Sequence, residues 1–384
     1  MTAHDTTTSN TTPATIANLN GDADSSFGTR LTPSAQPDIL AGPHDTDPRA
    51  AGALHRSHWP APDATAYDVV VVGGGAAGLG AALVLGRSRR RVLVIDAGEP
   101  RNVPAAHMHG YLTRDGMNPA AFLELGRAEV RGYGAEIVQG TVTMAERQDD
   151  GFTVMLADGR TVRGRRLLVT TGLADTLPAI PGLRERWARD VLHCPYCHGY
   201  EVRDQPLGVI TPSLFRVQHA PLFRHWSADL TVFPHTLSPD EIPADAREQL
   251  AAVGARLVEG LVTGVVVEAD HLTGVRMESG DVIPVRALFA GPGFEARDSL
   301  LMAMGAATTD AFMGTYVTTD PFGLTSLPGV WAAGNVTSPA VQVIDAASAG
   351  SRAAAAINLD LVHEDTERAV KALRAHRSEH AVAN

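Results

Sequence analysis

The most regular hydrophobic pattern of the chain lies between residues 67 and 96. An uncharged run rich in valine, Val69 to Gly86, begins like a buried strand, passes through a cluster of glycines and continues as a helix to Arg87. Its length alone would admit a membrane helix, but the glycines and valines favour a strand, a turn and a helix. A second apolar segment, "RVLVID", ends at Asp96 and predicts the next strand. The pattern therefore predicts a strand–helix–strand unit of a parallel sheet.

The glycine cluster of this unit has the pattern of a dinucleotide-binding turn. The motif G-x-G-x-x-G is formed by Gly73, Gly74, Gly75, Ala76, Ala77 and Gly78. Gly73 allows a tight turn, Gly75 lets a pyrophosphate approach the backbone, and Gly78 lets the helix pack closely on the strand. The free N–H groups at the start of the helix would face the phosphates. Asp96 stands where an acid accepts hydrogen bonds from a ribose diol, so the unit predicts dinucleotide binding.

The rest of the chain is predicted to complete this domain around an insertion. A helix is expected over Pro119 to Gly132, then a meander of short strands that closes at Thr171 and Gly172, and near the C-terminus a strand, a glycine turn and a long helix. We expect an α/β protein with two Rossmann-like, three-layer domains. The expected parts are the first portion of the dinucleotide domain at 67–189, an inserted domain at 190–288, the second portion at 289–362 and a C-terminal tail at 363–384.

Composition narrows the possible partners and the setting. Residues 1–66 are rich in Thr, Ser, Ala, Asp and Pro, and we expect them to be disordered because they offer little apolar surface to bury. With 32 basic and 43 acidic residues, the formal charge of -11 repels nucleic acid and anionic membrane surfaces, so neither is an expected partner. The basic cluster after the first helix, Arg87 and Arg89 to Arg91, suits a solvated helix end better than a phosphate site.

The two cysteines of the chain, Cys194 and Cys197, stand together in "HCPYCHGYE". They could be half of a zinc site, an inert disulfide or buried thiol pair, or a working dithiol. His193 and His198 lie too close along the chain to complete a tetrahedral site comfortably, so no metal is expected. Few cysteines and no charged segment followed by an apolar core at the N-terminus favour a reducing, cytoplasmic setting.

With these residues in place, the chain resembles the low-molecular-weight thioredoxin reductases, two-domain flavoproteins of the pyridine nucleotide-disulfide oxidoreductases, over about residues 67–362. The similar pieces are a Cys-x-x-Cys in the inserted domain, "TTG" at 170–172, "IPG" at 180–182 and "AAGNV" at 332–336. The resemblance implies a homodimer that binds FAD. The FAD-binding residues that the motif and the resemblance indicate are Gly73, Gly75, Ala76, Ala77, Gly78, Asp96, His109, Thr171, Gly172, Gly334, Asn335 and Gln342.

The resemblance also implies catalytic roles and shows departures from the family pattern. It places Cys197 toward the flavin and Cys194 toward the substrate. The residue after the pair is an acid in typical thioredoxin reductases and is His198 here, which we interpret as the acid/base because imidazole exchanges protons near neutral pH. The family usually carries Gly-Asp where this chain has Gly334 and Asn335. His109 could instead be an ordinary loop histidine.

The second glycine motif that NADPH binding requires is missing. In "QPLGVITPSLFRVQHAPLF", Pro212 removes an N–H donor, and Leu214 and Phe215 crowd the expected pyrophosphate path, so NAD(P)H binding is doubtful. A redox cysteine pair combined with such an altered turn resembles the FAD-dependent dithiol oxidases. The resemblance implies that a small-molecule dithiol is oxidised to a disulfide, with dioxygen as the electron acceptor. Two alternatives remain: an NAD(P)H-dependent reductase acting on a thioredoxin-like protein, and a non-catalytic flavin or redox-sensing protein.

Overall fold

The computed structural model describes residues 66–311 and 313–382. The disorder expected for residues 1–66 therefore lies outside the described residues, apart from Ala66. None of the helices in the described ranges combines the length and the apolar composition that a bilayer crossing needs. The uncharged run at Val69 to Gly86 is a strand, a glycine turn and a helix, as its composition predicts.

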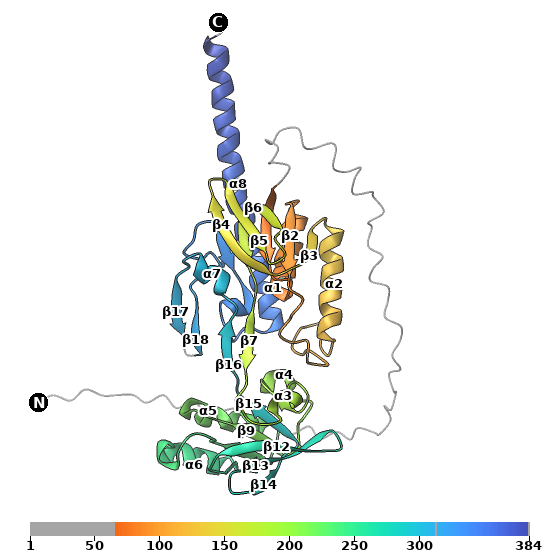
Figure 1. Cartoon of the computed structure of the whole chain (residues 1–384), viewed down its shortest axis with the longest axis vertical. Helices are drawn as coiled ribbons and strands as arrows, with labels where there is room; N and C mark the ends of the chain where they lie inside the picture. The colour runs from red at the N-terminus through yellow and green to blue at the C-terminus, as the bar shows by residue number, and fades with distance from the viewer. Residues whose placement is uncertain (1–65, 312, 383–384) are drawn as a thin grey trace, which may run out of the picture. The chain divides into compact units, whose positions relative to one another are not determined.

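The first domain is built on a seven-stranded sheet (Figure 1), and hydrophobic cores cover both faces of its central strands. Its strand order is β3-β2-β1-β6-β5-β4, with β19 beside β6. The parallel strands are β1 (Tyr67–Val72), β2 (Val92–Asp96), β3 (Glu136–Gln139), β6 (Thr161–Val169) and β19 (Val330–Ala332), and the antiparallel strands are β4 (Val142–Gln148) and β5 (Gly151–Leu156). Val69 and Val71 pack toward the helices α1 (Ala76–Arg87), α2 (Pro119–Gly132) and α8 (Val343–Val382). Val70 and Val72 pack on the opposite face, with α7 (Ser299–Ala303).

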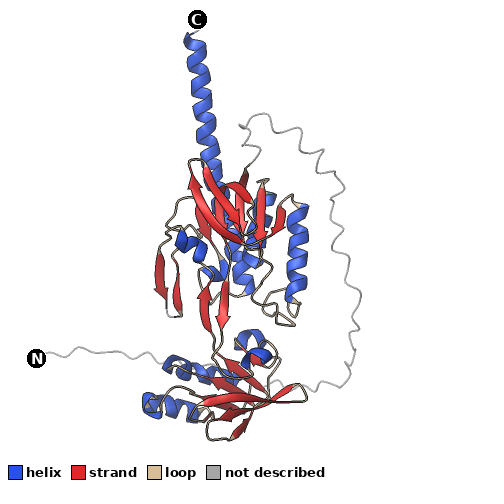
Figure 2. Ribbon diagram, in the orientation of Figure 1, coloured by secondary structure: helices blue, strands red, loops and turns tan. Residues whose placement is uncertain are grey.

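The second domain is a smaller three-layer unit (Figure 2). Its parallel sheet has the order β11-β10-β9-β15-β8 and consists of β8 (Val191–Leu192), β9 (Leu207–Ile210), β10 (Leu230–Phe233), β11 (Arg256–Leu257) and β15 (Ala287–Ala290). One face packs on α5 (Leu214–His219), the 3-10 helix η1 (Ala220–His225) and α6 (Ala244–Ala252). The other face packs on an antiparallel sheet of β12 (Val262–Glu268), β13 (His271–Met277) and β14 (Val282–Pro284).

Two antiparallel strands connect the domains. The chain leaves the first domain through β7 (Leu173–Thr176) and returns through β16 (Gly293–Ala296), which pairs with β7. The expected α/β architecture, with one Rossmann-like domain inserted into another, is thereby confirmed. The remaining elements are α3 (Leu183–Arg186), α4 (Pro195–His198), the 3-10 helices η2 (Pro239–Glu241) and η3 (Gly334–Val336), and the hairpin of β17 (Thr308–Ala311) and β18 (Gly314–Val317).

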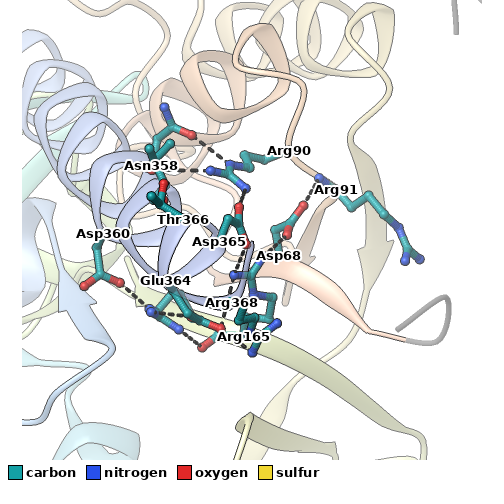
Figure 3. A network of polar contacts seen from close by, with 12 residues as sticks. Asp68, Arg90, Arg91, Arg165, Asn358, Asp360, Glu364, Asp365, Thr366 and Arg368 are labelled. Atoms are coloured by element: carbon teal, nitrogen blue, oxygen red, sulfur yellow. Dashed lines mark hydrogen bonds and ion pairs between the residues drawn. The ribbon is translucent and has the colours of Figure 1, made fainter. Parts of the chain in front are cut away.

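Helix α8 continues to Val382, through the described part of the segment expected as a C-terminal tail, 363–384. Polar contacts rather than apolar ones hold the helix where its core face ends at Leu361 (Figure 3). Asp365 accepts a hydrogen bond of 2.7 Å from Arg90 and one of 2.5 Å from Arg165. Arg165 also pairs with the buried Asp68 of β1 at 2.9 Å. These long-range pairs were not visible in the local hydrophobic pattern.

Candidate active site

The glycine turn between β1 and α1 has room for a ligand on one side only. Gly73 has φ +107°, and a Cβ there would lie 2.5 Å from the carbonyl oxygen of Thr170. A Cβ on Gly78 would lie 1.9 Å from the carbonyl oxygen of Gly73, so this glycine holds the helix against the strand end. By contrast, a Cβ on Gly75 would meet nothing within 4 Å. The open side therefore lies at the first N–H groups of α1, where a pyrophosphate would bind.

Asp96 lies at the carboxyl end of β2, directly beside this turn. Its Oδ1 accepts a hydrogen bond of 3.1 Å from the N–H of Gly74, and its Oδ2 accepts one of 3.0 Å from Arg127 of α2. These two contacts fix the orientation of the carboxylate. Each oxygen retains a further lone pair, which is what recognition of a ribose diol requires.

A cavity of about 900 Å³ extends from the glycine turn to the cysteines. Of the residues expected in the site, its lining includes Gly73, Gly75, Ala76, Ala77, Asp96, His109, Thr171, Gly172, Cys194, Cys197, His198, Gly334, Asn335 and Gln342. Gly78 does not line the cavity, because it packs against the backbone of Gly73 on the other side of the turn. The cavity, its glycine cradle and its unpartnered histidine nitrogens fit an elongated dinucleotide whose redox end lies at the cysteines.

The loop after β19 closes one side of the cavity, and Asn335 has a structural role in it. The Asn335 side-chain nitrogen donates hydrogen bonds to the carbonyl oxygens of Ser338, at 3.1 Å, and Val341, at 2.9 Å. An aspartate, the usual residue of the family pattern, has no donor for these contacts. The side-chain oxygen of Asn335 remains an acceptor for a ligand hydroxyl.

The cysteine pair lies at the start of the short helix α4. Cys194 is its N-cap residue, and its carbonyl oxygen accepts hydrogen bonds from the N–H groups of Cys197 and His198, both at 3.1 Å. Both cysteines are half-buried free thiols. The Cys197 thiol donates to Cys194 and, with nearby backbone N–H groups, lowers the pKa of Cys194 to about 7 against the opposing effect of burial. The same hydrogen bond, together with burial, raises the pKa of Cys197. Cys194 is thus the thiolate of the pair.

Histidines and carboxylates lie around His198, the residue that follows the pair. Neither ring nitrogen of His198 has a hydrogen-bond partner of normal geometry, and burial lowers the pKa of this side chain. The ring of His109 lies 6.4 Å from that of His198 between centroids. Its two nitrogens lie 3.4 Å from Asp115 and 3.5 Å from Glu201. The imidazole of His198 lines the same cavity as the thiols and can therefore accept a proton there, with the carboxylates of Asp115 and Glu201 beyond His109.

Two groups near the cysteines could not be identified from the sequence. Arg101 makes a bidentate ion pair with Asp175 of β7, at 2.6 and 2.8 Å, and its guanidinium lies over the ring of Phe294 in β16. Its positive charge also contributes to the lowered pKa of Cys194. Glu201 follows His198 by three residues in the quoted motif, lies 3.5 Å from His109 and raises the pKa of His198 against the effect of burial.

The second domain does not provide an open turn for a nucleotide after β9. Ser213 caps α5, which begins directly after Pro212. The guanidinium of Arg216 lies against Gly291, where a Cβ would come within 1.2 Å of its Nη1, and it donates to the carbonyl oxygen of Pro292 at 3.0 Å. Arg216 thus fills the crevice between the carboxyl ends of β9 and β15, which is where ligands bind in sheets of this kind.

The fold and the site together define a two-domain, FAD-dependent disulfide oxidoreductase of the thioredoxin reductase type. The chain belongs to the pyridine nucleotide-disulphide oxidoreductase family, whose model matches residues 67–354. FAD is the cofactor that this family membership indicates. Among the described residues, no group of three or more His, Cys, Asp or Glu side chains is placed to hold a metal ion.

Relatives by sequence and by structure agree with this assignment. The chain is 31% identical to the thioredoxin reductase sirT of Leptosphaeria maculans, over 78% of this chain and 95% of that protein. It is 30% identical to the thioredoxin reductase aclD of Aspergillus oryzae, over 78% of this chain and 98% of that protein. The crystal structure of HlmI superposes with a TM-score of 0.77 at 49% identity, covering 82% of this chain and 99% of HlmI.

Proposed function

We propose that this protein oxidises a small-molecule dithiol to a disulfide and that dioxygen accepts the electrons. The observation that carries the proposal is Arg216 of the second domain, whose guanidinium lies against Gly291 just beyond the carboxyl end of β15, where a nicotinamide nucleotide would be expected to bind. The redox pair and most of the residues expected to hold FAD line one cavity. These residues, together with the position of Arg216, support electron flow from substrate to flavin. As part of this proposal, the protein acts as a homodimer in the cytoplasm.

The chemistry of the cysteines consists of two exchange steps. One substrate thiolate attacks Sγ of Cys194 in the oxidised pair, the Cys194–Cys197 bond breaks, and a mixed disulfide forms. The second substrate thiolate then attacks the substrate sulfur of the mixed disulfide. This closes the product disulfide and releases the thiolate of Cys194. The low pKa of Cys194 makes it a good leaving group in this second step. Two electrons and two protons have then moved from the substrate to the site.

The proton balance assigns a role to His198. One substrate proton is transferred to the sulfur of Cys197, whose pKa is raised. The second is held at an imidazole nitrogen of His198. FAD, which Gly75 and Asp96 would hold, would supply the two-electron chemistry that returns the pair to its disulfide and passes the electrons to dioxygen. The net reaction converts a dithiol and dioxygen into a disulfide and hydrogen peroxide.

An anaerobic titration tests the direction of electron flow. A small dithiol should bleach the visible absorbance of the flavin, whereas excess NADPH or NADH should leave it nearly unchanged; admitting air should restore the colour and release peroxide. Cys194→Ser should retain the flavin and lose the bleaching by dithiol. Rapid stoichiometric bleaching by micromolar NADPH would overturn the proposal.

The competing function is an NAD(P)H-dependent thioredoxin reductase, which the names of the sequence relatives favour. It predicts that NADPH reduces the flavin and that a thioredoxin-like protein is then reduced. The same titration separates the two functions, because only the reductase needs the crevice that Arg216 fills. A protein that keeps its flavin but turns over neither dithiol nor NADPH would instead be a redox sensor.

A further inference from the structure

The two strands that connect the domains form a small sheet of their own. β7 and β16 have four residues each, and among the described strands they pair only with each other (Figure 1). A two-stranded ribbon of this length is marginally stable by itself and twists easily. The first domain carries the glycine turn and the second carries the cysteine pair, so a twist of the ribbon moves the cysteines relative to the turn. The ribbon therefore needs a further contact if the pair is to keep one position.

Arg101 makes such a contact with both strands at one point. Asp175 of β7 and Phe294 of β16 are directly opposite each other in the ladder, so their side chains lie on the same face. The guanidinium of Arg101 donates two hydrogen bonds to the Asp175 carboxylate, at 2.6 and 2.8 Å, and lies 5.4 Å from the centre of the Phe294 ring. The side chains of Arg101 and Asp175 are only 24% and 10% exposed, so water screens this ion pair less than a surface pair. We call these three residues the Arg101 clamp.

The clamp belongs to the segment that starts at Asp96, the expected ribose ligand. Arg101 follows Asp96 by five residues, between β2 and α2. The same segment has a second contact with the connection, because the carbonyl oxygen of Glu99 accepts a hydrogen bond of 3.2 Å from Arg297, the first residue after β16. A segment of the first domain that begins beside the glycine turn thus holds the ribbon at two places.

The contacts continue from the clamp to the cysteine pair. The ring of Phe294 meets the ring of His193 edge-on, with 5.2 Å between the centroids and 75° between the planes. Burial, followed by the positive charge of Arg101, lowers the pKa of His193 to about 4, so this imidazole is neutral near pH 7 and packs as an uncharged ring. His193 directly precedes Cys194 in the chain. A continuous row of contacts therefore leads from Arg101 through Phe294 and His193 to Cys194.

We propose that Arg101 is a positioning residue, which fixes the place of the redox pair in the cavity by holding β7 and β16 in one arrangement. Arginine suits this role because its planar fork matches a carboxylate with two parallel hydrogen bonds while its face covers an aromatic ring, and lysine offers no such fork. The clamp acts on electron transfer between the pair and the flavin in either direction. The inference is therefore independent of whether dioxygen or a nicotinamide nucleotide is the other reactant.

Three variants of the full-length flavoprotein separate position from charge. Arg101→Met removes the clamp and its charge, Arg101→Lys keeps the charge without the fork, and Asp175→Asn keeps Arg101 but removes the ion pair. Each should slow anaerobic bleaching of the flavin by saturating dithiothreitol roughly tenfold, because the pair and the flavin are then misaligned. The half-saturating concentration of dithiothreitol and the flavin content should be unchanged. Stopped-flow absorbance measures the rates.

Two further measurements do not depend on turnover. The pKa of Cys194 is lowered first by the hydrogen bond from Cys197 and also by the charge of Arg101, so the midpoint of Cys194 alkylation should rise in Arg101→Met alone. Amide hydrogen exchange in β7 and β16 should become roughly tenfold faster in all three variants, because the ribbon loses its clamp. Arg163→Met, which breaks an exposed ion pair with Asp150, is the control and should change neither measurement.

The outcomes distinguish the clamp from other roles of Arg101. Wild-type bleaching and wild-type hydrogen exchange in Asp175→Asn would overturn the proposal. Slow bleaching in Arg101→Met alone would also overturn it, because the charge rather than the clamp would then be responsible. If dithiothreitol failed to bleach the wild-type flavin, the proposed function would be contradicted, whereas hydrogen exchange in the three variants would still decide on the clamp.

Discussion

At the scale of single residues, Cys194 and Cys197 differ in acidity although their side chains are identical. The hydrogen bond between them favours the charge on Cys194 and the proton on Cys197. The backbone N–H groups of Tyr196 and Cys197 act in the same direction, because they also donate hydrogen bonds to the charged form of Cys194. The hydrogen bonds around the two sulfurs thus decide that Cys194, rather than Cys197, is the thiolate.

This asymmetry predicts the pH dependence of Cys194 alkylation. In the reduced protein the rate should rise with pH through about 7, because the thiolate is present above its pKa. Cys197→Ala should move this midpoint upward by removing the hydrogen-bond donor, whereas Cys197→Ser should move it less because the hydroxyl still donates. Mass spectrometry after timed alkylation measures the midpoint. An identical midpoint in all three proteins would contradict the assigned hydrogen bond.

The second prediction at this scale concerns His198. Replacing it by Gln should slow dithiol turnover by about 100-fold, because the proton acceptor beside the thiols is lost. Flavin content should be unchanged, and the pH dependence of turnover should change together with its rate. His271→Gln, at an exposed histidine in the second domain, is the matched control. Turnover of His198→Gln at the wild-type rate would remove the acid/base role.

At the scale of elements, the β1 turn and α1 combine packing and binding in a few residues. Gly73 and Gly78 are needed because a side chain would collide with the backbone, whereas Gly75 is needed only if a ligand occupies the open side. The protein alone would therefore tolerate a larger residue at Gly75. This difference separates the binding role from the structural one.

The prediction for this element is a loss of cofactor without a loss of fold. Gly75→Val should deplete bound FAD, because the side chain would occupy the approach of the pyrophosphate, while the circular dichroism spectrum stays native. Gly132→Val is the control, since a Cβ there also meets nothing within 4 Å but the site is remote. Measured flavin per protein should fall only in the first variant. Full occupancy in Gly75→Val would contradict the placement of the phosphates.

At the scale of the whole molecule, α8 is tied to the first sheet by a network of charged side chains (Figure 3). Arg165 and Asp68 are each 7% exposed at the side chain, and their ion pair is supported by Asp365. Breaking a buried pair on one side leaves an uncompensated charge, which costs more than the pair itself contributes.

We therefore predict that Arg165→Met lowers the free energy of unfolding by about 3 kcal/mol, because Asp68 stays buried without its cation. Arg160→Met, which breaks the exposed pair with Asp158, should change it by less than about 1 kcal/mol. Urea denaturation followed by circular dichroism measures both values. Equal effects of the two substitutions would show that the network does not stabilise the fold.

The sequence by itself determined the local parts of this protein. The β1–α1 turn and its glycines, the helix at Pro119–Gly132 and the alternation of buried strands follow from interactions among neighbouring residues, and so they were predicted correctly. The insertion of the second domain was predicted from the strand, glycine turn and long helix near the C-terminus, which complete the first domain. The residues expected around FAD could be named because most of them lie in contiguous motifs.

Tertiary structure alone decided the long-range pairs. Arg101 meets Asp175, Arg216 fills the space over Gly291, and α8 is held by Arg165 to the end of the sheet. An arginine side chain reaches a carboxylate or a glycine far along the chain only after the strands have brought them together, and many arginines in the sequence are equally suited to each contact. Which of them does so depends on the packing of the sheets.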